Sequence, residues 1–515
     1  MLETAEDYSF KKAGLSLAVI VILAAAFTLH ALAYWDWTED DAYITFRYAE
    51  NLAEGQGLVF NSGERVEGYS NFLWLIMTAG GMKAGIDPVP LSKTAGLISG
   101  LAALLLSWML ARRVCRPGSM VPLFAPLYMA AAPFVTRHSV SGLETCMFAA
   151  LTAGAVLAAA GGRGRRRQAI LTVLLIALSL TRVEGPVVAI LILAGRVLFS
   201  DEDNIRESLR ETFLFELLPY ILVFGIYYLW RWNYFNDPFA NTYYAKIHYG
   251  PAAVLRGGRY TAEFIRDAGG AVFIGLAAVP FLFRNCGKTF RFSALVIVFY
   301  TGFIILSGGD WMFFYRFYAH IIPILIPMIA AGASCILMIA ASRGTGVGAL
   351  RILAGGVMIA VFLVTAAAER RIANLVLPAV RNHNYLSQNY MELAGWFKDN
   401  TDPDVTVAIS DVGAFSYYSD RRVLDLFELV TRNFKRASDH PGCATVSDYI
   451  LAREPEYIVL MVKDPSNGET VLIRPYDSQM YHNPEFRRNY TLLHRIPQHW
   501  NHETARIYRI KKAGQ

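Results

Sequence analysis

Long apolar segments constrain this chain more than any other feature. Runs close to the roughly 17 to 25 apolar residues that a membrane-crossing helix needs recur through the first 370 positions. They lie at residues 14–34, 90–111, 119–136, 140–160, 167–181, 184–200, 213–232, 269–284, 291–307, 317–341 and 349–368. Only 17% of residues are charged, whereas soluble domains carry about a quarter. We therefore expect a polytopic α-helical membrane protein with about eleven transmembrane helices.

The charges between the runs predict how the chain is oriented. Lys11 and Lys12 place the N-terminus in the cytoplasm, and the arginine-rich connectors, such as residues 163–167, then fall on the same side. Residues 71–85 are apolar enough to span, but counting them would move Arg112 to the outside. We therefore expect this segment to be a juxtamembrane or re-entrant helix near the outer surface.

The other polar connectors fall outside the membrane on this topology. They are the acid-rich first loop, residues 35–89, and residues 137–145, 181–185, 236–250 and 308–320. Several loops that meet on one face predict a pocket there. A nucleic-acid partner would need a basic face on a soluble fold, and the arginines between apolar runs do not form one, so no such partner is expected.

The composition changes after residue 368. Residues 385–400 have an amphipathic helical pattern, and 405–410 and 456–462 have the Val and Ile content of buried strands. Two later segments, YTLLHRI and ARIYRIK, alternate like strands of a partly exposed sheet. The prediction is a membrane module over residues 1–368 and an extracytoplasmic α/β domain over residues 369–515.

Three adjacent acids, Glu39, Asp40 and Asp41, open a helical pattern in the first outer loop. One interpretation is that they cap the helix, because Thr38 stands where the first residue of a capping box would be. The other is that one carboxylate is a general base that removes a proton from a hydroxyl. Like charges raise the pKa of one member of such a pair. The residues leave the choice between Asp40 and Asp41 open.

Several motifs together carry a family resemblance. DDAYITFRYAENLAEGQGLVFNSGERVEGYSNFLW, followed by SGLET, TRVEG, NTYYAK, GGDWMFFYRF and ISDVGAFSYYSDRRVLDL, resembles the GT-C superfamily of integral membrane glycosyltransferases. The branch it resembles most contains the mycobacterial arabinofuranosyltransferases that cap arabinan chains, and the resemblance covers nearly the whole chain. It implies a sugar donor on a polyprenyl phosphate and two juxtamembrane helices that frame an acidic catalytic motif.

By this resemblance Asp40 or Asp41 is the catalytic base. Glu67 is similar in position to an acid that helps to bind a metal in the lipid A aminoarabinose transferases; the alternative is a surface carboxylate. No cofactor is expected to be required, and a divalent metal is allowed. Among Cys and His residues no metal-binding spacing exists. His138, His248 and His320 lie in outer connectors, where a hydrogen-bonded polar histidine is the alternative to a metal or phosphate ligand.

The donor's phosphate needs positive charge near the outer surface, since Arg binds phosphate oxygens in pairs and Lys acts as a point charge. The candidates for binding the donor's phosphate or sugar are Lys246, Arg316, Arg182, Tyr243, Tyr244 and Asn241. The alternatives are snorkelling cations and an aromatic interface belt. Further polar residues are expected to line the pocket: Arg47, Glu67, Glu144, Glu184, Asp310 and His320. Glu144 is expected to pair with Arg137 or Arg182.

Together these features predict an inverting glycosyltransferase of the bacterial cytoplasmic membrane. It would move a sugar, with arabinofuranose implied by the resemblance, from a polyprenyl phosphate to a glycan or glycolipid acceptor on the outer face. The alternatives are a transporter or flippase of the lipid-linked sugar and a scaffold without chemistry. Transporters place functional charges near the bilayer midplane and often carry repeats, whereas the charges here fall in outer loops and no repeat is visible.

Overall fold

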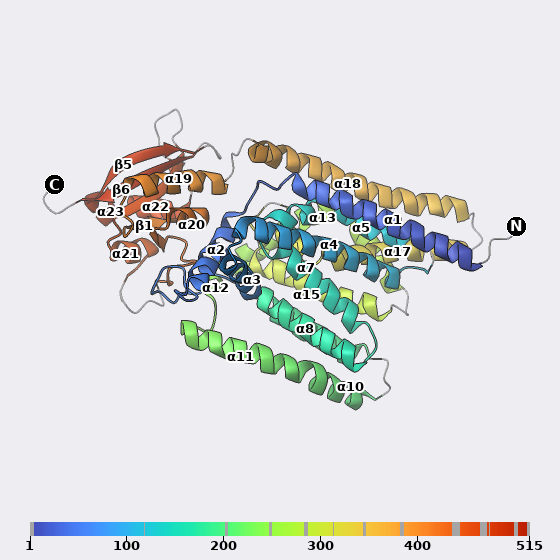
Figure 1. Cartoon of the computed structure of the whole chain (residues 1–515). Coiled ribbons are helices and arrows are strands. Elements are labelled where there is room, and N and C mark those ends of the chain that lie inside the picture. The colour runs from blue at the N-terminus through green and yellow to red at the C-terminus, as the bar shows by residue number, and fades with distance from the viewer. Residues whose placement is uncertain are drawn as a thin grey trace. The chain divides into compact units, whose positions relative to one another are not determined.

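In the computed structural model, the chain forms two compact units (Figure 1). The described residues are 5–117, 119–200, 204–246, 250–282, 287–312, 314–342, 347–381, 386–434, 443–463, 471–472, 474–498 and 503–511. The bundle unit contains Met1–Trp35, Ser92–Tyr227 and His248–Val376. The loop-tail unit contains Asp36–Leu91, Tyr228–Ile247 and Leu377–Gln515.

The bundle unit is helical. Its helices are α1 (Ala5–Leu32), α4 (Pro88–Val114), α5 (Phe124–Ala131), α6 (Pro133–Thr136), α7 (Thr145–Ala159), α8 (Arg165–Thr181), α9 (Gly185–Leu198), α10 (Ile205–Thr212), α11 (Leu218–Phe235), α13 (Pro251–Ala268), α14 (Gly270–Ala278), α15 (Lys288–Ser307), α16 (Arg316–Ala319), α17 (Ile322–Ser342) and α18 (Val347–Arg381). Short turns are η1 (Val121–Leu123), η2 (His138–Val140), the π-helical η3 (Phe213–Leu217) and η4 (Val279–Leu282).

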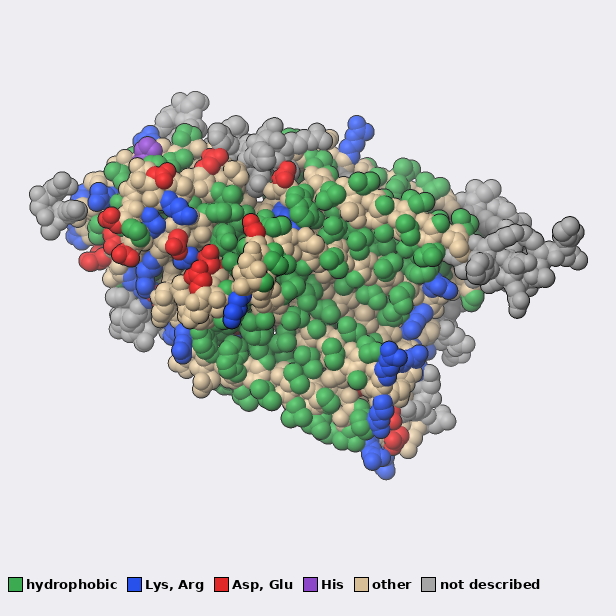
Figure 2. Space-filling view, in the orientation of Figure 1, with side chains coloured by type: hydrophobic (Ala, Val, Ile, Leu, Met, Phe, Trp, Pro, Cys, Tyr) green, Lys and Arg blue, Asp and Glu red, His purple; other side chains and the backbone are tan. Residues whose placement is uncertain are grey.

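Each predicted apolar run is largely helical where the chain is described. Within the described residues, 5 helices are long and apolar enough to cross a membrane, or up to 7 if two bent helix pairs each count as one crossing. Large apolar side chains such as Leu29 (70% exposed) and Ile226 (67% exposed) face outward, and Figure 2 shows hydrophobic side chains over much of the bundle surface. An outward apolar face on a helical bundle suits contact with lipid. The predicted polytopic helical membrane fold is confirmed.

Basic connectors meet at one end of the bundle. Arg113, after the apolar part of α4, donates to the carbonyl of Leu157 near the end of α7. Arg163, between α7 and α8, donates to the Arg196 carbonyl at the end of α9 and to Ser208 of α10. Figure 2 shows Lys and Arg side chains gathered beside α10. These connectors therefore share one side, as the topology predicts.

The loop-tail unit contains the first loop and the end of the chain. Its helices are α2 (Asp40–Ala53), α3 (Phe72–Lys83), α12 (Asn241–Lys246), α19 (Leu386–Asn400), α20 (Gly413–Ser419), α21 (Val446–Leu451), α22 (Pro475–His482) and α23 (Pro484–Asn489). Helix α2 is buried on nearly all sides, because consecutive residues from Ala42 to Phe46 are all buried, whereas an amphipathic helix at a surface buries one side. Helix α3 has 12 residues, and at about 1.5 Å per residue it is too short to cross a bilayer.

A mixed sheet lies at the centre of the tail. Its strands are β1 (Thr406–Ile409), β2 (Arg422–Asp425), β3 (Tyr457–Lys463), β4 (Val471–Leu472), β5 (Tyr490–Pro497) and β6 (Thr504–Ile510). The order is β2-β1-β3-β6-β5, with β4 on β3. Strand β1 pairs in parallel with β2 and β3, whereas β6 is antiparallel to β3 and β5. Strand β3 is buried up to Val462, which explains its continuous apolar sequence.

The compact units group the chain differently from the predicted boundary at residue 368. The first loop belongs with the tail, together with residues 228–247, because these segments contact each other closely. The two-domain division at residue 368 remains a prediction.

Candidate functional site

The acidic stretch stands at the start of α2, where Asp40 contacts the tail. Glu39 is the residue before the helix, and it makes no side-chain cap bond. The interpretation of Thr38 as the first residue of a capping box is wrong, because the helix begins one residue later, although Asp40 and Asp41 do lie in its first turn. Asp40 instead binds the backbone at the start of α20: its Oδ2 accepts from the Gly413 N–H at 3.0 Å and its Oδ1 from the Ala414 N–H at 2.8 Å.

This contact is close and buried. A Cβ on Gly413 would lie 2.0 Å from the Asp40 backbone oxygen and 2.6 Å from Oδ2, so only glycine fits. Asp40 is 6% exposed. Burial, followed by the charge of Asp411, raises its pKa to about 8, while the Ala414 and Gly413 N–H groups act in the opposite direction. Its neighbour Asp41 is only partly buried.

Two further residues join the first loop to the tail. Arg47, predicted to line the pocket, donates from Nη1 to Asp420 Oδ1 at 2.5 Å. Asn61 donates to the Val423 carbonyl at 2.8 Å and accepts from the Val423 N–H at 3.1 Å. The Asn61 amide thus pairs with the backbone of edge strand β2 as a neighbouring strand would, which covers that edge.

Glu67 forms a buried ion pair rather than an open metal ligand. Its Oε2 accepts from Arg231 Nε at 2.8 Å and also from Arg231 Nη2. Burial raises the pKa of Glu67, and Arg231 opposes that shift. Within the described residues, no group of three or more His, Cys, Asp or Glu side chains could hold a metal. A cation at Glu67 would have to displace a guanidinium, so these residues do not fit a metal site.

Asn241, which is predicted to bind the sugar donor, makes structural contacts within the loop-tail unit. Its backbone N–H donates to the Glu67 carbonyl at 2.8 Å. Its side-chain amide donates to the Thr431 carbonyl at 2.7 Å, to the Leu429 carbonyl at 3.3 Å and to the Glu428 carbonyl. These acceptors occupy its amide hydrogens, so Asn241 fixes α12 to the loop after β2.

The two predicted tyrosines of α12 also have local partners. The Tyr243 ring stacks on Phe239, with the ring centres 4.7 Å apart. The Tyr244 hydroxyl donates to Asp237 at 2.8 Å. The side chain of Lys246 lies outside the described residues. The structure therefore gives these tyrosines aromatic and polar neighbours from their own segment.

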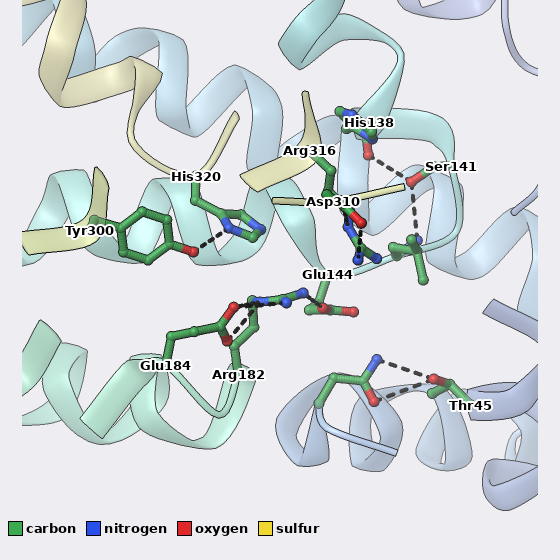
Figure 3. A network of polar contacts seen from close by, with 12 residues as sticks. Thr45, His138, Ser141, Glu144, Arg182, Glu184, Tyr300, Asp310, Arg316 and His320 are labelled. Atoms are coloured by element: carbon green, nitrogen blue, oxygen red, sulfur yellow. Dashed lines mark hydrogen bonds and ion pairs between the residues drawn. The ribbon is translucent and has the colours of Figure 1, made fainter. Parts of the chain in front are cut away.

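In the bundle unit, a buried ion-pair network joins two of the predicted outer connectors (Figure 3). Arg182 Nη2 lies 3.0 Å from Glu184 Oε1, and Arg182 Nη1 contacts Glu144. All three side chains are at most 7% exposed. The expected pairing of Glu144 with Arg182 is present.

A second ion pair and a histidine lie beside Arg182. Asp310 receives two bonds from Arg316, Nε to Oδ2 at 2.7 Å and Nη2 to Oδ1 at 3.2 Å. His320 Nδ1 lies 2.6 Å from the Tyr300 hydroxyl, as Figure 3 shows. His320 is fully buried.

Some buried polar atoms around these ion pairs have no hydrogen-bond partner among the described residues. They are His320 Nε2 and Thr145 Oγ1. The Tyr260 side chain packs against Gly309, next to Asp310. Buried polar atoms are rarely left without partners, so this part of the bundle suits a polar ligand.

His138 belongs to no group of His, Cys, Asp or Glu side chains that could hold a metal among the described residues. His138 Nε2 lies 3.3 Å from the Phe314 carbonyl, which matches the alternative of a hydrogen-bonded polar histidine. His248 lies outside the described residues.

Sequence reasoning missed several residues that make buried contacts. Arg231 was counted within an apolar run, although it holds Glu67. Lys93, 2% exposed, donates to the Trp35 carbonyl, and a lone Lys at the start of an apolar helix is a signal that could have identified it. Gly413 lies in the ISDVGAFSYYSDRRVLDL motif, and a glycine three residues after a predicted strand is the available sign of a close backbone contact.

Comparisons with known proteins agree with this architecture. Residues 379–510 match a family described as a domain of unknown function, DUF8728. A segment of 66 residues is 39% identical to the terminal β-(1→2)-arabinofuranosyltransferase of Corynebacterium glutamicum, covering 12% of this chain and 10% of that protein. The chain thus spans about a tenth of that curated relative.

Solved structures are similar over most of the chain. ArnT from Cupriavidus metallidurans bound to undecaprenyl phosphate has a TM-score of 0.59 at 13% identity, covering 96% of this chain and 98% of ArnT. The arabinofuranosyltransferase AftD from Mycobacteria has a TM-score of 0.52 at 14% identity, covering 96% of this chain and 40% of AftD. The chain therefore shares its fold with these two solved structures, and a short segment of it is similar to an arabinofuranosyltransferase.

Proposed function

We propose that this protein is an inverting membrane glycosyltransferase that uses a polyprenyl-phosphate sugar, with arabinofuranose as the first sugar to test. The acceptor would be a hydroxyl of a cell-envelope glycan or glycolipid on the outer face of the cytoplasmic membrane. Support for the donor class comes from the ArnT fold, since that protein was solved with undecaprenyl phosphate. Support for the sugar comes from the segment shared with the arabinofuranosyltransferase.

One observation carries the proposal: the acid pair of the first loop is held in a fixed position. Asp40 is bound to two backbone N–H groups of the tail, and Asp41 follows it in the same helix. A fixed carboxylate can take the proton of an acceptor hydroxyl as its oxygen bonds to the sugar's anomeric carbon. The bond from that carbon to the phosphate oxygen breaks, and the polyprenyl phosphate leaves with the electron pair. A single displacement of this kind inverts the anomeric centre.

The leaving phosphate would need cations, and the bundle unit offers two that are buried. Arg182 and Arg316 are each already paired with carboxylates. We infer that the phosphate takes over part of those interactions when it binds, next to the partnerless His320 Nε2. Arg suits this exchange, because its planar group can hold carboxylate and phosphate oxygens at the same time.

The test is transfer by the purified protein in liposomes. The wild type receives polyprenyl-phosphate arabinofuranose and an oligoarabinoside acceptor, and the product is analysed by mass and by the configuration of the new bond. The proposal predicts an acceptor one pentose heavier, with the anomeric configuration opposite to that of the donor. The same donor with another sugar measures the preference for arabinofuranose.

A parallel measurement follows movement of the donor across the liposome membrane. If the wild type moves the lipid-linked sugar between leaflets and forms no glycosidic product with any donor sugar, the transporter alternative is right and the glycosyltransferase proposal is wrong. A product with retained configuration would contradict the single displacement.

A further inference from the structure

A residue of the first loop is hydrogen-bonded to the start of α20 in the tail. Strands β2, β1 and β3 are parallel, and α20 connects β1 to β2. The Asp40 side chain accepts from the backbone N–H groups of Gly413 and Ala414, the first two residues of α20.

The fit of this contact is specific for the pair of residues that forms it. Both Asp40 oxygens are in use, and the absence of a Cβ at Gly413 lets the two backbones meet. Thr38, two residues before Asp40, is held as well, since Ser387 of α19 donates to the Thr38 carbonyl at 2.7 Å. The start of α2 is thus fixed against the tail from two directions.

Fixing Asp40 also fixes where Asp41 points. Successive residues of a helix project about 100° apart, so Asp41 cannot share the contact that buries Asp40. Asp41 is partly buried, whereas Asp40 is 6% exposed. A proton acceptor must come within hydrogen-bond reach of the substrate hydroxyl, and of the two acids Asp41 is the more accessible.

We propose that Asp40 is a positioning residue, bound in cis by the tail, that directs Asp41, and that Asp41 takes the proton from the acceptor hydroxyl. This inference rests on the proposed function and adds a division of roles within the acid pair. It also makes the tail part of the catalytic machinery, since the tail supplies both donors that hold Asp40.

The two roles are separated by an acceptor that has no proton to remove. Azide can displace the polyprenyl phosphate without a base and gives a glycosyl azide. With the Asp41→Asn variant, transfer to the hydroxyl acceptor should fall about 1,000-fold or more, within the range of general-base losses, while transfer to azide stays close to wild type. With Asp40→Asn, both transfers should fall together, by about 10- to 100-fold, because misplacement affects every acceptor.

Gly413→Ala tests the same contact from the tail side. Like Asp40→Asn, it should lower transfer to the hydroxyl acceptor and transfer to azide together. The double variant should be as active as the less active of the two single variants, since both changes break the same contact. The matched controls are Asp404→Asn, an exposed tail acid, and Gly395→Ala, whose added Cβ meets nothing within 4 Å. Both controls should behave as wild type.

The outcomes separate this inference from the proposed function. Folding of each variant is checked by thermal unfolding in detergent, and if Asp40→Asn fails to fold, Gly413→Ala decides the point. If Asp40→Asn loses hydroxyl transfer and keeps azide transfer while Asp41→Asn stays active, the roles are reversed and the inference is wrong, although the proposed function stands. If the wild type transfers sugar to neither acceptor, the proposed function itself fails.

Discussion

At the scale of single residues, neighbouring acids differ because one of them is bound by backbone. Asp40 sits in a buried contact with Gly413 and Ala414, whereas Asp41 keeps partial access to solvent. The sequence predicted both acids as candidates and left the choice open. Hydrogen bonds from backbone N–H groups leave no residue-type signature, so only the structure could separate the two.

The raised pKa of Asp40 predicts how stability depends on pH. Its ordinary value of 3.8 becomes about 8 in the folded protein, so between these values the folded state holds a proton that the unfolded state has released. Stability from this group is therefore present at low pH and is lost as pH rises toward 8, by at most about 1.4 kcal/mol per pH unit. The melting temperature of Asp40→Asn should fall less between pH 5 and pH 8 than that of the wild type. This pH window lies between the two pKa values of Asp40. An unchanged slope would contradict the assigned pKa.

Replacing Arg182 should lower the stability of the protein far more than replacing an exposed arginine. Arg182→Gln leaves Glu144 and Glu184 buried without their cation, and breaking a buried pair in this way costs about 3 to 5 kcal/mol. Arg259→Gln, at an exposed position of α13, is the control. Melting temperatures in detergent compare the two variants. Equal melting temperatures would show that the network contributes little to stability.

At the scale of elements, close helix packing in the bundle depends on small residues. A Cβ on Gly332 of α17 would lie 1.9 Å from the Leu276 carbonyl oxygen of α14. Small residues allow such approach between membrane helices. Gly332→Ala should therefore destabilise the protein by about 1 to 3 kcal/mol, as overpacking does.

Gly275→Ala is the matched control, because its added Cβ meets nothing within 4 Å. In α14 that change should leave stability unchanged or raise it by about 1 kcal/mol through helix propensity. Thermal unfolding of both variants measures the difference. If Gly332→Ala is as stable as Gly275→Ala, α14 and α17 do not approach as closely as described.

Elements with a strong local pattern could be predicted from the sequence. The apolar runs became helices, and the Val- and Ile-rich segments of the tail became β1 and β3. Helix α13 was missed, because Arg256, Arg259 and Arg266 interrupt its apolar pattern. Its buried side includes Tyr260 and Phe264, so its stability comes from packing that no single stretch of sequence reveals.

At the scale of the whole molecule, the chain combines segments that lie far apart in sequence. The first loop, residues 228–247 and the tail form one compact unit. Local patterns could not predict this grouping, because side chains of the first loop bind backbone groups about 370 positions away in the chain. Asp40 binds the Ala414 N–H, and Asn61 binds the Val423 carbonyl. The family resemblance predicted a helical membrane fold, which the chain shares with the solved ArnT and AftD structures, but not the partner of Asp40.

One measurement tests the central claim most directly: the initial rate of sugar transfer from polyprenyl-phosphate arabinofuranose to a hydroxyl acceptor, for the wild type and for Asp41→Asn in matched liposomes. Asp404→Asn is measured beside them as the control for the change of an acid to its amide. The account predicts an inverted product from the wild type and the control, and a loss of about 1,000-fold or more in Asp41→Asn. Full transfer by a folded Asp41→Asn variant would contradict it.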